Sequence, residues 1–163
     1  MKNFLSLHRL FFLALIAISA SFAAQAEVTS KLEAYVVYEV ADGQERFKRS
    51  DSGEPGDTIE YRISYSNNGE KSVSDLAATG MVPFNTEYVG ESDTTKVRSD
   101  FRVSIDGGLT WDEEPVVRVR TLPVSRSEEV TIPPSDYTHV RWHANERLGA
   151  NEIQEFSYRV RVQ

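Results

Sequence analysis

Strict alternation of apolar and polar side chains marks residues 57–67. The apolar positions are Ile59, Tyr61, Ile63 and Tyr65, and the polar positions between them are Glu60, Arg62, Ser64 and Ser66. Successive side chains of a β-strand point to opposite faces, so this pattern predicts a strand with one buried face and one solvated face. Residues 156–162 alternate in the same way and predict a second strand near the carboxyl end.

Further short segments are rich in β-branched and aromatic residues, and Gly, Pro, Asn and Asp lie between them. These segments are 31–40, 72–79, 87–89, 101–105, 116–119 and 138–143. No window after residue 26 shows sustained helical spacing. The sequence therefore predicts an all-β fold, an immunoglobulin-like antiparallel β-sandwich of about eight strands.

Two turn signals flank the strand at 57–67. Before it, Pro55 fixes φ, Gly56 tolerates unusual φ, and the Asp57 side chain can bond nearby backbone amides, so these three residues predict a turn that starts the strand. After it come Asn67, Asn68 and Gly69, which tolerate positive φ. They predict a hairpin that joins residues 57–67 to 72–79.

The amino terminus has the pattern of a secretion signal. Lys2 and Arg9 precede or border an apolar run at 10–22, and small residues at Ala24 and Ala26 frame an A-Q-A cleavage sequence. A membrane anchor is the alternative, but the run is shorter than the ~20 residues of a spanning helix. We expect a cleaved signal peptide at 1–26, one domain at 27–163, and an exported protein, periplasmic or secreted, without a membrane anchor after cleavage.

Charge and cysteine content exclude several functions. Without Lys2 and Arg9 the chain has 16 basic and 25 acidic side chains, a formal charge of −9. Such a chain repels a phosphate backbone, so nucleic acid is not an expected partner. The sequence contains no cysteine, which excludes disulfides, thiol catalysis and thiolate metal sites.

The segment 104–111 follows the pattern S-x-D-x-G-x-T-W. Its defining residues are Ser104, Asp106, Gly108, Thr110 and Trp111. The pattern resembles the Asp-box of propeller blades in sialidases and related glycan-handling proteins, where Asp and Thr bond a tight turn and Trp packs beneath it. A chain of this length cannot build a propeller of four or more blades. A structural hairpin is the expected role, with contact to sugar as the alternative.

Several of these motifs occur together in one known family. The segments 54–61, 65–69, 82–89, 103–111 and 148–162 together resemble the conserved-repeat domain of bacterial surface and secreted proteins, domain of unknown function number eleven. The resemblance implies an immunoglobulin-like fold and no catalytic residues. The family usually occurs as repeats, whereas this chain carries one copy, so a spacer role is not expected.

Candidate metal and catalytic residues are sparse. His139 and His143 would begin ~13 Å apart on a strand, too far to share one ion. Acidic loops could form a weak calcium site, although none has regular calcium-loop spacing. No G-x-S-x-G segment marks a serine nucleophile, and composition alone leaves paired carboxylates open. We expect neither an enzyme nor a cofactor.

These observations favour an exported, non-enzymatic binding or structural module of the cell envelope. The expected partner is another envelope or secreted protein, bound at an exposed edge strand through added backbone hydrogen bonds. The alternatives are a carbohydrate-binding module or cryptic glycosidase, suggested by the Asp-box, and a calcium-stabilised adhesive domain.

Overall fold

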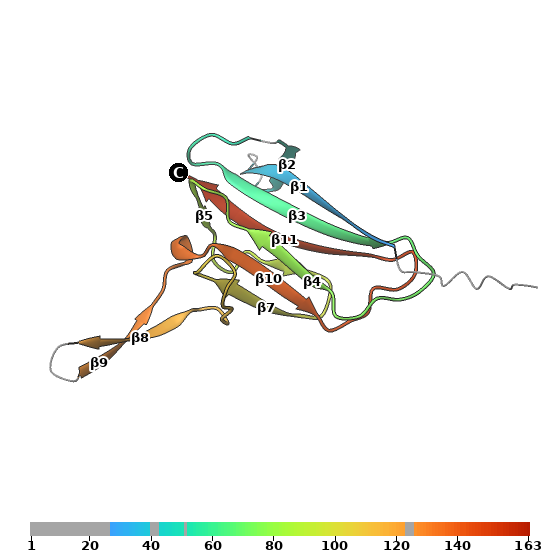
Figure 1. The fold of residues 1–163 in the computed structure, drawn as a ribbon. Helices are drawn as coiled ribbons and strands as arrows, with labels where there is room; N and C mark the ends of the chain where they lie inside the picture. Colours follow the sequence, from blue (N-terminus) through green and yellow to red (C-terminus); the bar gives the residue numbers. More distant parts are fainter. Residues whose placement is uncertain (1–26, 40–42, 51, 123–125) are drawn as a thin grey trace, which may run out of the picture.

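The computed structural model describes residues 27–39, 43–50, 52–122 and 126–163, and these form an all-β fold with a single short 3₁₀ turn (Figure 1). The predicted signal peptide at 1–26 lies outside the described residues. Among the residues that are described, no helix is long and apolar enough to cross a membrane.

The larger of the sheets is antiparallel and contains the strand predicted at 57–67. Its strands are β1 (Val28–Glu39), β2 (Glu45–Arg49), β3 (Thr58–Asn67), β5 (Thr86–Tyr88), β6 (Thr94–Thr95) and β11 (Ile153–Val162). Their order is β2-β1-β3-β11-β5, and β6 pairs with β11 beside β5. The first and last long strands thus lie on either side of β3.

A smaller antiparallel sheet has the order β4-β10-β7. Its strands are β4 (Ala77–Met81), β7 (Ser99–Ser104) and β10 (His139–Ala144). The remaining strands, β8 (Val117–Leu122) and β9 (Arg126–Thr131), pair only with each other and project away from both sheets (Figure 1). The 3₁₀ turn η1 (Pro134–Asp136) connects this hairpin to β10.

The two sheets pack against each other around aromatic side chains. Trp142 of β10 is fully buried, and its ring centroid lies 5.6 Å from that of Phe156 and 6.2 Å from that of Tyr158, both on β11. Valines from both sheets complete the same buried cluster. Truncating a core aromatic of this kind typically costs ~3–5 kcal/mol, so this interface is a main source of the stability of the fold.

Each of the eight predicted segments overlaps a strand. The sequence reading missed β2, β6 and β9, so the described residues form eleven strands rather than about eight. β2 and β9 have the sequences ERFKR and RSEEVT, in which charged residues stand next to one another. These strands bury no continuous apolar face, and alternation therefore could not identify them.

The predicted hairpin between residues 57–67 and 72–79 is wrong. β3 pairs with β1 and β11, whereas β4 pairs with β10 in the other sheet. Neither Asn68 nor Gly69 adopts the positive φ that a two-residue hairpin turn needs. Instead Val73 bridges to Leu148, and the chain crosses from one sheet to the other.

Candidate functional site

The Asp-box residues form a closed hydrogen-bond network at the end of β7. The Asp106 carboxylate accepts the hydroxyls of Thr110 (2.6 Å) and Ser104 (2.8 Å), as well as the backbone N–H groups of Leu109 and Thr110. These donors, the Thr110 hydroxyl foremost, lower the pKa of Asp106 to about 2. Because its oxygens are already occupied, Asp106 is suited to holding the turn and not to binding a ligand.

The other Asp-box residues support the same turn. Gly108 has a φ of +87° and donates its N–H to the Ser104 hydroxyl (2.9 Å). Trp111 lies with its ring 3.7 Å from the guanidinium carbon of Arg141 on β10. Arg141 covers one face of Trp111, so that face is not open to a sugar.

Pro55, Gly56 and Asp57 form the turn that precedes β3. Gly56 has a φ of +94°, and the Asp57 N–H donates to the Glu54 carbonyl (2.9 Å), which is the geometry of a type II turn. The Asp57 carboxylate accepts the Glu54 N–H (2.8 Å), and Gly56 donates to the Val162 carbonyl. The turn ties the start of β3 to the end of β11.

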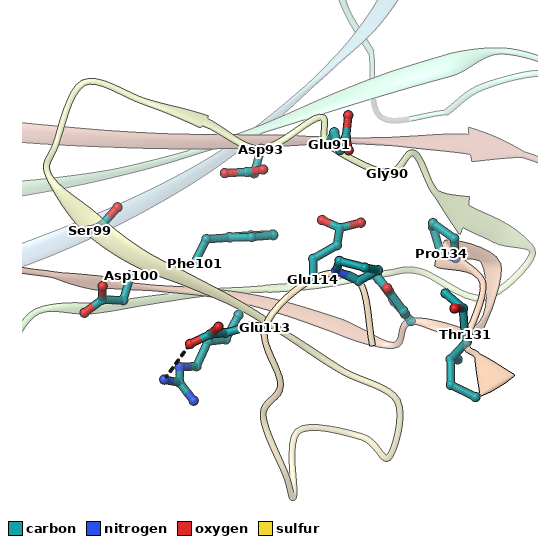
Figure 2. A pocket seen from close by; sticks show the side chains of 14 residues that line it. Gly90, Glu91, Asp93, Ser99, Asp100, Phe101, Glu113, Glu114, Thr131 and Pro134 are labelled. Atoms are coloured by element: carbon teal, nitrogen blue, oxygen red, sulfur yellow. Dashed lines mark ion pairs between the residues drawn. The ribbon is translucent and has the colours of Figure 1, made fainter. Parts of the chain in front are cut away.

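A pocket of about 760 Å³ opens beside β7 (Figure 2). It is lined by the loop after β5, the start of β7, the segment before β8 and the base of the β8–β9 hairpin. Five carboxylates contribute to the lining: Glu91, Asp93, Asp100, Glu113 and Glu114. The structure thus brings together two acidic loops, 91–93 and 113–114, that are separate in the sequence.

Only one of these five carboxylates has a cationic partner among the described residues. Glu113 pairs with Arg102 (3.6 Å), and Asp100 accepts from Asn145, but Glu91, Asp93 and Glu114 form no ion pair there. Figure 2 shows the Glu114 carboxylate directed toward the loop with Glu91 and Asp93. Burial raises the pKa of Asp93 and of Glu114, and the neighbouring negative charges raise that of Glu114 further.

Buried donors lie next to the same carboxylates. The Trp142 indole N–H and the Tyr88 hydroxyl make no direct hydrogen bond of normal geometry to a described residue. The indole N–H is nevertheless close enough to Asp93 to oppose the rise of its pKa, and the Tyr88 hydroxyl acts likewise on Glu114. Neither Trp142 nor Tyr88 lines the pocket, so both donors act on these carboxylates from within the core.

On the opposite side of the sandwich, a groove of about 490 Å³ separates β4 from β1 and β3. Most of its lining is apolar or aromatic: Ser30, Lys31, Leu32, Tyr61, Ile63, Tyr65, Thr79, Gly80, Met81, Pro83 and Tyr158. Leu32 and Met81 are each 59% exposed. Neither the groove nor its apolar exposure was foreseen from the sequence.

No described strand pairs with the edge of β4 that faces away from β10. Val82 N–H bonds Thr138 O and Ala144 N–H bonds Leu76 O, so the even-numbered residues of this segment direct their backbone groups to β10. The backbone groups of Ala77 and Thr79 therefore point outward. No other described strand pairs with them. β4 also carries no charged side chain.

The two histidines of β10 have different surroundings. His143 is exposed, and the His139 ring lies edge-on to Trp111 with its Nδ1 beside the Thr138 hydroxyl. Within the described ranges there is no group of three or more His, Asp or Glu side chains placed to hold a metal ion.

Searches of protein-family models, curated protein sequences and solved structures returned no significant match to this chain.

Proposed function

We propose that this protein is an exported, non-enzymatic module that binds another protein of the cell envelope. The observation that carries the proposal is the unpaired, uncharged edge of β4, with the exposed apolar groove beside it. Proteins normally blunt such edges because they pair readily with other chains. An edge that stays open and apolar is therefore suited to binding a polypeptide.

We also propose that the fold is immunoglobulin-like and related to the conserved-repeat domain of surface proteins. Two packed antiparallel sheets with an aromatic core support this relation. In constant-type immunoglobulin domains the last strand pairs in the sheet opposite the first two, whereas β11 lies beside β3. The relation we propose is therefore one of architecture and not of strand order.

Affinity capture tests the binding function. Residues 27–163 are used as bait against the envelope fraction of the source organism, beside a doubly charged variant, Leu32→Glu with Met81→Glu. The control is Val119→Glu on the β8–β9 hairpin, since Val119 is 67% exposed. We expect one protein to be retained by the wild type and the control and lost with the double variant. Retention of polysaccharide alone would reject the proposal.

The acidic pocket supports a carbohydrate-binding site as a second candidate. The pocket is lined by three carboxylates that form no ion pair with a described residue, Glu91, Asp93 and Glu114, and by the aromatic rings of Phe101 and Tyr137. Groups of these kinds recognise sugars. A glycan array probed with the wild type and with Glu114→Gln tests this candidate, and Glu128→Gln on the hairpin is the charge-matched control. Binding that only Glu114→Gln weakens would favour it, and an array without a hit would reject it.

A further inference from the structure

We propose that the groove between β4 and β1 receives a single extended segment of the partner protein, which becomes the fourth strand of the smaller sheet. This inference rests on the proposed protein-binding function and specifies how the partner binds. Its basis is the backbone of β4, the exposed inner face of β1 and the difference in width between the two sheets.

The backbone of β4 offers the hydrogen bonds that a strand requires. Ala77 and Thr79 direct both N–H and C=O away from β10, whereas the Met81 carbonyl already accepts the Tyr158 hydroxyl (2.6 Å). An antiparallel strand centred on Thr79 would pair with these groups at ordinary ladder spacing. The outward N–H and C=O groups of β4 are thus complementary to the backbone of an extended peptide and not to a compact ligand.

The smaller sheet covers only part of the apolar face of the larger sheet, and the part that stays exposed lies at β1. Phe156, Ile63 and Leu32 lie in register on neighbouring strands, and these residues are 0%, 5% and 59% exposed, so exposure rises toward β1. β4 approaches β3 of the facing sheet, so β1 extends beyond the edge of the smaller sheet. A strand added to β4 would lie above β1 and bury Leu32.

The same projection of β1 argues against a second copy of the domain as the occupant. If two copies joined β4 to β4 around a two-fold axis, the β1 strands of both copies would extend into the same space beneath the junction. A lone strand has no second layer and fits above β1 without this overlap. The groove therefore accommodates a segment and excludes a sandwich.

Pairing rules give the chemistry of the segment. Residues directly opposite Ala77 and Thr79 would face solvent, and the residues between them would point to the apolar floor. The segment should thus alternate aliphatic and polar side chains. Arg46 and Lys48 lie opposite Tyr38 and Val36 on the inward side of β2, and neither forms an ion pair with another described residue. An acidic residue at the end over β2 would complement them.

The end that bears the acid follows from the direction of β4. Ala78 of β4 pairs with Trp142, and Trp142 packs on Phe156, which lies in register with Leu32 of β1. Two residues further along β4, Gly80 lies against Tyr158, which lies in register with Ala34 of β1. β4 and β1 therefore run in the same sense, and Met81 is the end of β4 nearer to Val36 and β2. An antiparallel segment begins at that end, so its acidic residue is amino-terminal.

The test uses residues 27–163 and a synthetic probe, an eight-residue peptide of alternating valine and threonine with aspartate at its amino terminus. The control peptide has the same composition with the valines consecutive. Hydrogen exchange followed by NMR reads out the amides of Ala77 and Thr79. We expect the alternating peptide alone to slow their exchange by roughly tenfold or more. Equal exchange with and without it would overturn the inference.

A variant pair gives an independent measurement. Thr79→Pro removes an outward-facing N–H at an edge position, where proline is tolerated, and Thr79→Val keeps that N–H. We expect Thr79→Pro to weaken peptide binding roughly tenfold and Thr79→Val to leave it unchanged. Equal binding by both would overturn strand insertion.

Capture of the natural partner separates this inference from the proposed function. A partner retained equally by Thr79→Pro and the wild type would preserve the protein-binding function and overturn insertion at β4. A concentration-dependent dimer, detected by sedimentation without peptide and abolished by Thr79→Pro, would overturn the single-segment occupant in favour of a second copy.

Discussion

The side chain of Asn67 joins the end of β3 to the segment that follows it and to a loop about 80 residues further along the chain. It is fully buried, and its Nδ2 group donates to the carbonyls of Lys71 (2.7 Å), Gly149 (3.0 Å) and Leu148 (3.2 Å). Its Oδ1 accepts the N–H of Gly69 (3.1 Å). The end of β3, the crossing to β4 and the loop before β11 are therefore held by one amide.

Replacing this amide with a methyl group leaves buried carbonyls without their donor. Two donor hydrogens and one acceptor are lost, and each such hydrogen bond contributes about 1 kcal/mol net, so Asn67→Ala should cost about 3 kcal/mol. For a chain of this size the loss corresponds to a fall in Tm of roughly 10 °C. Asn67→Asp should cost more, because a carboxylate would face carbonyl oxygens instead of donating to them.

The neighbouring Asn68 provides the matched control. It is exposed, and its side chain makes one hydrogen bond to the described residues, to the Thr29 hydroxyl (3.2 Å). Asn68→Ala should change the free energy of unfolding by less than about 0.5 kcal/mol. Urea denaturation of the three variants measures the difference. Equal stability of Asn67→Ala and Asn68→Ala would refute the assignment of this junction to the Asn67 amide.

Three further predictions concern stability. The pKa of Asp106 is lowered to about 2, so the Asp106 carboxylate stabilises the fold fully above pH ~4, and this stabilisation is lost as the pH falls through 2. In thermal scans the difference in Tm between Asp106→Ala and the wild type should shrink over that range. Burial raises the pKa of Glu114, so the negative charge of Glu114 opposes folding at pH 7. Glu114→Gln should therefore raise the Tm at pH 7 and have no such effect below pH ~4, where the carboxyl is protonated in both states. Thermal scans at a series of pH values measure this difference. A Cβ on Gly80 would clash with the Tyr158 ring, so Gly80→Ala should lower the free energy of unfolding by ~1–3 kcal/mol in urea denaturation. Tyr158→Phe loses one hydrogen bond and should cost about 1 kcal/mol.

Alternation predicted where strands lie but not which strands pair. Ile59 and Ile63 repeat at the period of a strand, and both are buried as that period requires. The partners of β3 come from opposite ends of the chain, and nothing within residues 57–67 specifies β1 or β11. Turn chemistry was the only local guide to pairing. It failed at Asn67 because the side chain turns inward to bind distant carbonyls, whereas a hairpin turn would have used its backbone.

The candidate sites were harder to predict than the strands. The Asp-box is a local motif, because the groups that donate hydrogen bonds to the Asp106 carboxylate all lie within residues 104–110. Its sequence pattern was therefore enough to predict the position of the turn. The acidic pocket depends on the juxtaposition of two loops, 91–93 and 113–114, across the open side of the sandwich. Their composition alone indicated solvated loops. Only the packing of the sheets brings Glu114 opposite Asp93 and raises the pKa of both.

The edge strands of the two sheets differ in charge, and this difference bears on the function of the groove beside β4. Four of the five residues of β2 are charged, and β7 carries Asp100 and Arg102, which are features that discourage pairing with other chains. β4 has the sequence AATGM, without a charge, beside the exposed Leu32. A chain that protects two edges and leaves a third apolar and unpaired incurs an aggregation hazard there. Such a hazard is most simply explained if a partner strand covers β4 in the functional protein.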